Sequence, residues 1–363
     1  MKNFCSALFF LMLSFRGLGQ TNQSWYKVYT GKVGNLAATI HLHQAEKNYN
    51  GYIWFDQNQW PIPFYSGDRV GLTDSINLSC SSGPVSLNLT GVLNSESFKG
   101  TSVLEKEGSS SKKAQFELQL NNDKKFTSFG YISAHDSTAL LPQIKNESTC
   151  DYIVASVWPK GNTSVDAALK KQIAKMLSMP ATVTEPGKWF TSFVNKSAAA
   201  WKKDNSKLSP KDASEVGLSL SVQEENRVMV MYENAYYITL ANYTFSYTGG
   251  AHGNYATSLA VIDKQNGQQI KLTDVLNTAG IKLLPVLLEK VARLQYGIKN
   301  NLPLDQNNFL VKKVEPSKNF YITSSGIGFL YAPYEIKSFA EGDVNLLIPF
   351  TALNTYLLPG FQH

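Results

Sequence analysis

No stretch of the sequence approaches the ~20 consecutive apolar residues that a membrane-spanning helix needs. The first residues hold only a short apolar run, Ala7–Leu13, which follows a basic start and precedes small residues at Gly17 and Gly19. This pattern is typical of a cleavable secretory signal peptide over residues 1–19. We therefore expect a mature chain without a transmembrane segment that lies in the periplasm or outside the cell.

Cysteine is scarce as well, with three in 363 residues. Cys5 lies ahead of the apolar run of the signal, so it is not the cysteine that a lipoprotein would carry after such a run. Cys80 and Cys150 remain in the mature chain, in a compartment where disulfides persist. A disulfide and two buried free thiols both stay open for them, because the sequence does not show that they meet.

The excess of positive charge is small, with 34 Lys and Arg against 28 Asp and Glu. No dense basic run is present, and a secreted protein meets little nucleic acid. We interpret the excess as a solvated surface, and no nucleic-acid partner is expected.

Recognisable catalytic motifs are missing: there is no G-x-S-x-G elbow, P-loop, Rossmann fingerprint, H-E-x-x-H pair or EF-hand loop. The sequence therefore predicts no cofactor and no metal. His41 and His43 share one face of a predicted strand and could supply two metal ligands, but no third is marked, so a solvated strand face is favoured. Tyr52, Trp54 and Trp60 could stack on a sugar, but packing in a core is favoured.

Short apolar strands separated by glycine- and proline-containing turns run from Trp25 to about Leu120, with no amphipathic helix between them. This pattern of short strands and turns is typical of an antiparallel sandwich or barrel. Residues 20–145 are therefore predicted to form an all-β module. The polar stretch Asn121–Thr149 is expected to contain its end.

Helices join the strands after residue 146. Thr163–Leu177 and Gly187–Lys203 space their apolar residues as helices do, and in the second helix the apolar stripe consists of Phe190, Phe193, Val194 and Trp201. Long alternating strands follow from residue 215, and a further helix is predicted from Ile281 to about Tyr296. The expected fold is an α+β region, an antiparallel sheet with packed helices, divided into residues 146–235 and 236–358.

The stretch Y-T-F-S-Y-T-G-G-A-H-G-N-Y, from Tyr243 to Tyr255, predicts a strand that enters a glycine-rich hairpin and returns. Its glycines, Gly249, Gly250 and Gly253, permit positive φ, and His252 stands at the tip. The ligand-binding candidates are Tyr247, Gly249, Gly250 and His252 of the hairpin, with Tyr334 and Glu335 of the later segment P-Y-E-I.

No catalytic residue is assigned. A general base at His252 would need a carboxylate to orient it, and Asp263, Asp274 or Glu335 could supply one. The alternative is favoured, in which His252 only caps the hairpin.

Four segments together carry a resemblance to a known family: Y-T-F-S-Y-T-G-G-A-H-G-N, D-K-Q-N-G-Q-Q-I-K-L-T-D-V-L, F-Y-I-T-S-S-G-I-G-F-L-Y-A-P-Y-E-I-K-S-F-A-E-G-D and V-N-L-L-I-P-F. They resemble the extracytoplasmic domain of the anti-sigma factor RsiV, which senses lysozyme, and the region before the catalytic domain of the peptidoglycan deacetylase PdaC. The resemblance implies a cell-envelope protein with a lysozyme-like protein or peptidoglycan as partner. Neither a sigma-binding segment nor the deacetylase motif is present, so those two activities are not expected.

The sequence thus favours a secreted or periplasmic binding protein without catalytic activity. Two alternatives stay open: a small-substrate hydrolase centred on His252, and a structural module of an envelope assembly.

Overall fold

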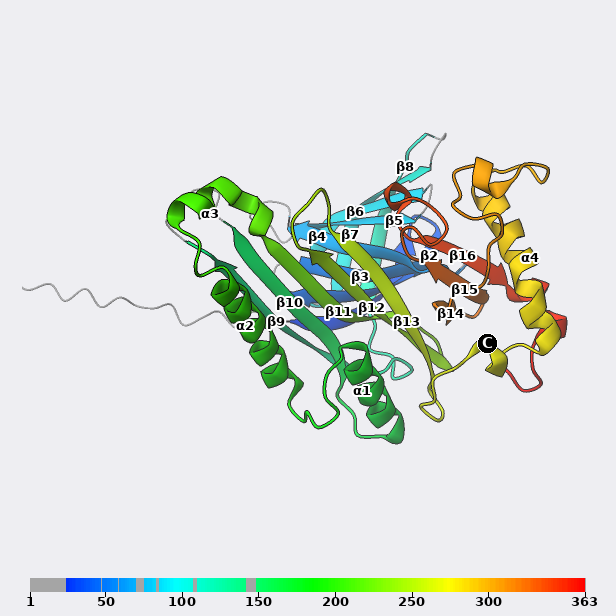
Figure 1. Cartoon of the computed structure of the whole chain (residues 1–363). Coiled ribbons are helices and arrows are strands. Elements are labelled where there is room, and N and C mark those ends of the chain that lie inside the picture. The colour runs from blue at the N-terminus through cyan, green and yellow to red at the C-terminus, as the bar shows by residue number, and fades with distance from the viewer. Residues whose placement is uncertain are drawn as a thin grey trace, which may run out of the picture.

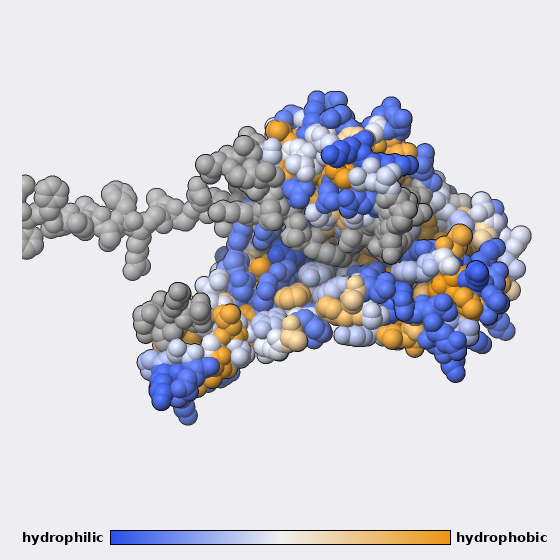
Figure 2. Space-filling view, turned by 90° about the horizontal axis from the view of Figure 1, so that it is seen from above, coloured by the Kyte–Doolittle hydropathy of each residue, from blue (hydrophilic) through white to orange (hydrophobic). Residues whose placement is uncertain are grey.

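The computed structural model describes residues 24–46, 48–57, 59–69, 75–82, 85–106, 110–141 and 148–362. The predicted signal peptide lies outside them. Figure 1 shows a barrel, in blue to cyan, packed against a long twisted sheet in green to yellow. Helices α1 and α2 line the sheet, and the C-terminal segment with α4 lies at its end. Seen from above, the end that carries α3 projects away from the barrel and leaves a hollow between them (Figure 2).

The N-terminal module is a closed barrel of eight antiparallel strands in chain order. It closes because β1 pairs with β8 as well as with β2. Inward-facing apolar side chains, among them Tyr29, Ile40 and Phe98, fill its interior. The strands are β1 (Trp25–Val33), β2 (Leu36–Ala45), β3 (Asn48–Phe55), β4 (Ile62–Arg69), β5 (Ser75–Ser82), β6 (Val85–Leu93), β7 (Ser97–Lys106) and β8 (Lys112–Leu120).

The second region is built on a five-stranded sheet of order β13-β12-β11-β10-β9. All its neighbouring strands are antiparallel except β10 and β11, which are parallel. A parallel pair needs a long crossover, and three helices provide it here. The elements are β9 (Phe129–Ala139), β10 (Thr149–Pro159), α1 (Ser164–Met176), α2 (Pro186–Asp204), α3 (Pro210–Val216), β11 (Val222–Glu233), β12 (Tyr237–Tyr247) and β13 (Asn254–Asp263).

Local sequence explains the two long crossover helices. Thr163 and Asp166 form a capping box at the start of α1, and Pro186 occupies the first turn of α2, where its missing N–H costs nothing. Leu169 and Ile173 of α1 and Phe190 and Val194 of α2 are buried against the sheet. The two helices therefore cover the β9–β10 side of one sheet face.

A three-stranded antiparallel sheet of order β14-β15-β16 follows, with α4 packed on β16. Its core joins Leu284 and Leu288 of α4 to Phe329 and Leu346 of the sheet. Pro285 lies inside α4 rather than in its first turn, because the helix begins earlier than predicted. The elements are α4 (Thr278–Gln295), β14 (Phe320–Ile322), β15 (Gly326–Tyr331) and β16 (Val344–Pro349).

Six short 3₁₀ turns are found in the described part of the second region. They are η1 (Gly217–Leu220), η2 (Leu272–Asp274), η3 (Leu304–Gln306), η4 (Phe339–Glu341), η5 (Phe350–Ala352) and η6 (Asn354–Tyr356).

The barrel joins the sheet where β10 and β11 separate. Their pairing ends at Ser156 and Val228, and two residues later the Val230 N–H donates to Nε2 of His43 on β2, at 3.2 Å. Both His41 and His43 are fully buried in this junction. The prediction of a solvated strand face for them is therefore wrong, because the face they occupy is covered by the second region.

Further barrel residues belong to the same junction. Tyr52 packs with Met229 and Met231 of β11, and Trp54 stacks on His41 with ring centroids 4.7 Å apart. Tyr52 and Trp54 are buried, as expected for residues that pack in a core, whereas Trp60 is half-buried.

The predicted fold class is confirmed: an all-β barrel precedes an α+β region. The sequence-based domain limits stay a prediction, but β9 lies before residue 145 and pairs with β10 along its whole length.

Cys80 and Cys150 are free thiols buried in two different cores, so they do not form a disulfide with each other. Over the described residues, no helix combines the length and apolar character required to cross a membrane.

Candidate functional site

The ends of β12 and β13, with the turn between them, form a hairpin arm. Pairing of Phe245 with Tyr255 and of Thr244 with Ala256 sets its register. Successive strand residues point to opposite sides, so the arm has an aromatic side with Tyr243 and Tyr255 and a polar side with Thr244. The two sides of the hairpin therefore differ in character, one aromatic and the other polar.

The tip of the arm has the backbone that the glycines predicted, with one exception. Gly249 and Gly250 have φ of +87° and +98°, and a Cβ at Gly249 would lie 2.5 Å from the carbonyl oxygen of Ser219. Gly253 does not have a positive φ; it is needed because a Cβ there would lie 2.3 Å from the Phe245 ring. The Tyr247 hydroxyl donates to the Gly250 carbonyl at 3.2 Å, which ties the tip to its own strand.

The aromatic side of the arm meets the segment between β15 and β16. His252 stacks on Phe339 with ring centroids 4.3 Å apart, and Tyr255 and Tyr334 lie at 5.7 and 5.8 Å from the same ring. We call these four residues the aromatic surface. The structure thus brings together two of the predicted site residues, His252 and Tyr334, through a phenylalanine that the sequence did not single out.

Tyr334 is held in an unusual position. Its side chain is 57% exposed, and its φ is +71°, a conformation that costs a non-glycine residue on the order of 1–3 kcal/mol. The Tyr334 N–H donates to the Lys337 carbonyl at 2.9 Å, and Glu335 accepts from the Ala332 N–H at 2.9 Å. Lys337 is itself buried over the Tyr296 ring and paired with Glu341. The loop therefore presents an aromatic ring to solvent on a firmly bonded backbone.

A partly buried carboxyl, that of Asp343, lies next to Tyr255 of the aromatic surface. Burial raises the pKa of Asp343 from its ordinary 3.8 to about 7; Thr257 opposes the shift and the negative charge of Glu335 adds to it. Its Oδ1 atom is buried and has no hydrogen-bond partner among the described residues. Asp343 is also close to Tyr255, whose pKa is raised to about 12 by burial and then by this carboxylate.

We expect Asp343→Asn to stabilise the protein at pH 8 by about 1–3 kcal/mol and to leave it unchanged near pH 3.5. The folded state keeps a proton that the unfolded chain releases between about pH 4 and 7, so stability falls as the pH rises through this window. Urea unfolding of both proteins at the two pH values measures the difference. An equal effect of the substitution at both pH values would contradict it.

The structure does not support His252 as a general base, because none of the three candidate carboxylates orients its ring. The ring is exposed, and its Nδ1 atom lies 2.9 Å from the carbonyl oxygen of Gly253. The three carboxylates that could orient it are used elsewhere: Asp263 accepts from Gln265, Asp274 from Lys271 and Glu335 from Ala332. Within the described ranges, no group of three or more His, Cys, Asp or Glu side chains is placed to hold a metal ion.

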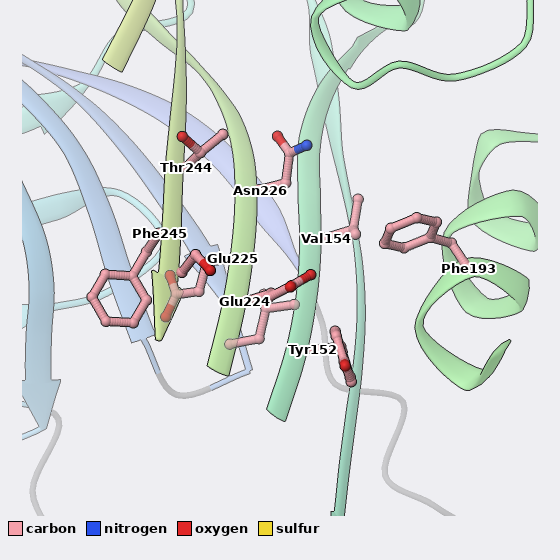
Figure 3. Close-up of a pocket in the computed structure, with 10 residues that line it drawn as sticks. Tyr152, Val154, Phe193, Glu224, Glu225, Asn226, Thr244 and Phe245 are labelled. Carbon is pink, nitrogen blue, oxygen red and sulfur yellow. The ribbon is translucent and has the colours of Figure 1, made fainter. Parts of the chain in front are cut away.

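A pocket of about 280 Å³ lies at the base of the arm, on its polar side (Figure 3). Strands β10, β11 and β12 form its floor, and Phe193 projects from α2 toward Val154 at its edge. Phe193 belongs to the apolar stripe that the sequence indicates for its helix, and it is 40% exposed. The sequence signal for this pocket is weak, since its lining is spread over four elements: Tyr152, Ile153, Val154, Phe193, Glu224, Glu225, Asn226, Thr244, Phe245 and Ser246.

One part of the chain matches a known protein family. Residues 262–351 match DUF3298, a protein family of unknown function. The match runs from the end of β13 to η5, so it includes Tyr334, Glu335 and Phe339 but not the hairpin tip. No curated protein matches the chain.

Two solved structures of DUF3298 proteins are similar to this chain. The one from Bacteroides fragilis NCTC 9343 is 20% identical, covers 64% of this chain and 94% of its own, and has a TM-score of 0.56. The one from Pseudomonas aeruginosa PAO1 is 15% identical, covers 64% and 95%, and has a TM-score of 0.44. The likeness to the Bacteroides protein is one of fold alone.

Proposed function

We propose that this protein is a non-catalytic binding protein of the bacterial cell envelope, and that it recognises a lysozyme-like protein or peptidoglycan through the aromatic surface. The predicted signal peptide supports the location. The four resembling segments support the choice of ligands, since two of them contribute residues to the arm and to the facing loop.

The observation that carries the proposal is the state of Tyr334. The Tyr334 ring is largely exposed, on a strained backbone held by Lys337 and Glu335, and its contact with the Phe339 ring leaves most of it in water. Exposed and pre-positioned aromatic rings are the residues that dominate binding energy at protein interfaces, and they also stack on sugar rings. His252 and Phe339 extend the same surface.

We expect Tyr334→Ala to weaken ligand binding by at least about tenfold while the free energy of unfolding stays within about 0.5 kcal/mol. Binding of the mature chain, residues 20–363, to lysozyme and to purified peptidoglycan sacculi is measured first, and the variant is then compared on whichever ligand binds. Leu294→Ala is the matched control, because Leu294 is 85% exposed, lies on α4 and is not one of the four residues of the aromatic surface.

Tyr334→Gly separates binding from strain. It removes the same ring but permits the positive φ, so it should bind as weakly as Tyr334→Ala and be at least as stable as the native chain. Failure of the native chain to bind either ligand would refute the proposal, and unchanged binding by both Tyr334 variants would move the site away from the aromatic surface.

A further inference from the structure

The pocket at the base of the arm is built by strand register. Tyr152 and Val154 of β10 are paired with Glu224 and Asn226 of β11, and these are paired in turn with Ser246 and Thr244 of β12. Residues paired in this way share one face of the sheet. The six side chains therefore form one continuous patch, with apolar β10 residues on one side and polar β12 residues on the other.

The patch is open because the helices stop short of it. Helix α2 packs on β9 and β10, and Phe193 is its side chain at the pocket. Phe193 also stacks on Trp189, with ring centroids 5.3 Å apart, so the helix presents an aromatic wall. Ligand pockets commonly have volumes of roughly 300–1,000 Å³. At about 280 Å³, this one suits a single long side chain rather than a large cofactor.

The polar groups of the pocket are mainly hydrogen-bond acceptors. Its lining contains Glu224, Glu225 and Asn226 and no lysine or arginine. Glu225 is already paired with Arg227, whose Nε lies 2.9 Å from it, whereas the described residues offer no ion pair to Glu224. The Oδ1 atom of Asn226 is buried and accepts no hydrogen bond from any described residue. A carboxylate and an unused amide oxygen beside aromatic rings favour a cationic donor on an apolar stem.

We propose that this pocket binds the side chain of an arginine or lysine presented by a protein partner. The guanidinium or ammonium group lies against Glu224 and Asn226, and its aliphatic stem lies between Phe193 and Tyr152. The exposed polar strip of Ser246 and its β13 neighbour Asn254 continues beside the pocket and suits the backbone of a peptide rather than a free small cation. The proposal concerns the polar side of the arm and does not depend on the aromatic surface.

A pair of tripeptides tests the proposal on the mature chain, residues 20–363. Both are acetylated and amidated at their ends; one has a central arginine, and the other has citrulline, a neutral side chain of the same shape. Titrations followed by amide chemical shifts are expected to show the arginine peptide binding at least about tenfold more tightly, with the shifts centred on residues 152–154, 193, 224–226 and 244–246.

Two variants act in opposite directions. Glu224→Gln should weaken binding of the arginine peptide about tenfold, and Ser246→Asp, which adds a second carboxylate opposite Glu224, should tighten it several-fold. Glu315→Gln, an exposed carboxylate outside the pocket, is the matched control and should change nothing. Tyr334→Ala should also leave the affinity unchanged, which keeps this site distinguishable from the aromatic surface.

Three results would overturn the proposal: equal affinity for the arginine and citrulline peptides, no response to Glu224→Gln, or shifts centred elsewhere. A titration with n-butylguanidinium checks the nature of the partner. If this small cation bound as tightly as the arginine peptide, the strip beside the pocket would contribute nothing, and recognition of a protein partner would be wrong.

Discussion

Replacing His43 with alanine is expected to lower the free energy of unfolding by about 3–5 kcal/mol. The ring is fully buried between Tyr26 and Tyr131, with centroid distances of 4.8 and 5.3 Å, and its removal leaves a cavity. It also leaves the Val230 N–H without its acceptor at a place where water is excluded. Urea unfolding of the native chain and the variant measures the loss.

His43→Leu separates the two contributions. Leucine fills much of the space but accepts no hydrogen bond, so we expect a loss of about 1–3 kcal/mol from the unpaired Val230 N–H. A leucine variant as stable as the native chain would show that this hydrogen bond does not hold the barrel to the sheet.

The same residue links stability to pH. Burial lowers the pKa of His43 to about 3, and it also lowers the pKa of His41, with the nearby His43 and Lys264 as further causes. The unfolded chain therefore takes up protons that the folded state refuses, and this contribution to stability is lost as the pH falls from about 6.5 toward 3. The loss over that range should be smaller in His43→Leu than in the native chain.

Glu233→Ala is expected to cost about 3–5 kcal/mol, because it breaks a buried ion pair from one side only. The Glu233 carboxylate lies 2.7 Å from the Lys264 ammonium and accepts from both the N–H and the hydroxyl of Thr127. Thr127 belongs to the segment that connects β8 to β9, so this one side chain fixes the connection between the barrel and the sheet. The removal would leave Lys264 and Thr127 without their shared acceptor.

Two further variants define the cause. Glu233→Gln keeps an oxygen acceptor and should cost less than Glu233→Ala. The double change Glu233→Leu with Lys264→Met removes both charges and should be less destabilised than the sum of the single changes, because no unpaired charge stays buried. Additive losses in the double variant would mean that the two groups do not interact.

Local patterns were sufficient for much of the fold. The capping box at Thr163, the apolar spacing of α1 and α2 and the glycine-separated strands before residue 120 all act within a few residues of themselves. β9 is different, because it lies within the polar stretch Asn121–Thr149, and it forms a strand through its ladder with β10 rather than through its own composition. The parallel pairing of β10 with β11 is also a matter of topology, although the helices between them are a usable signal.

The site divides in the same way. The sequence predicts the glycine tip and marks His252, Tyr334 and Glu335, since glycines and exposed polar segments are visible locally. It cannot show that His252 and Phe339 stack, because that contact joins the β12–β13 turn to η4. The sequence also does not predict the burial of His41 and His43, because the surface that covers their strand face belongs to a distant part of the chain.

The barrel has a consequence for the order in which the chain folds. Each of its strands pairs with the next in sequence, and the pairing of β1 with β8 closes the module, so the barrel can close once residues up to 120 are available. β10 must wait for β11, which follows three helices later. During that interval the part of the barrel surface that β11 covers, at Tyr52 and at the Nε2 atom of His43, lacks that strand. β11 therefore docks onto a surface that the closed barrel provides, and a slowly closing barrel would be expected to delay the second region as well.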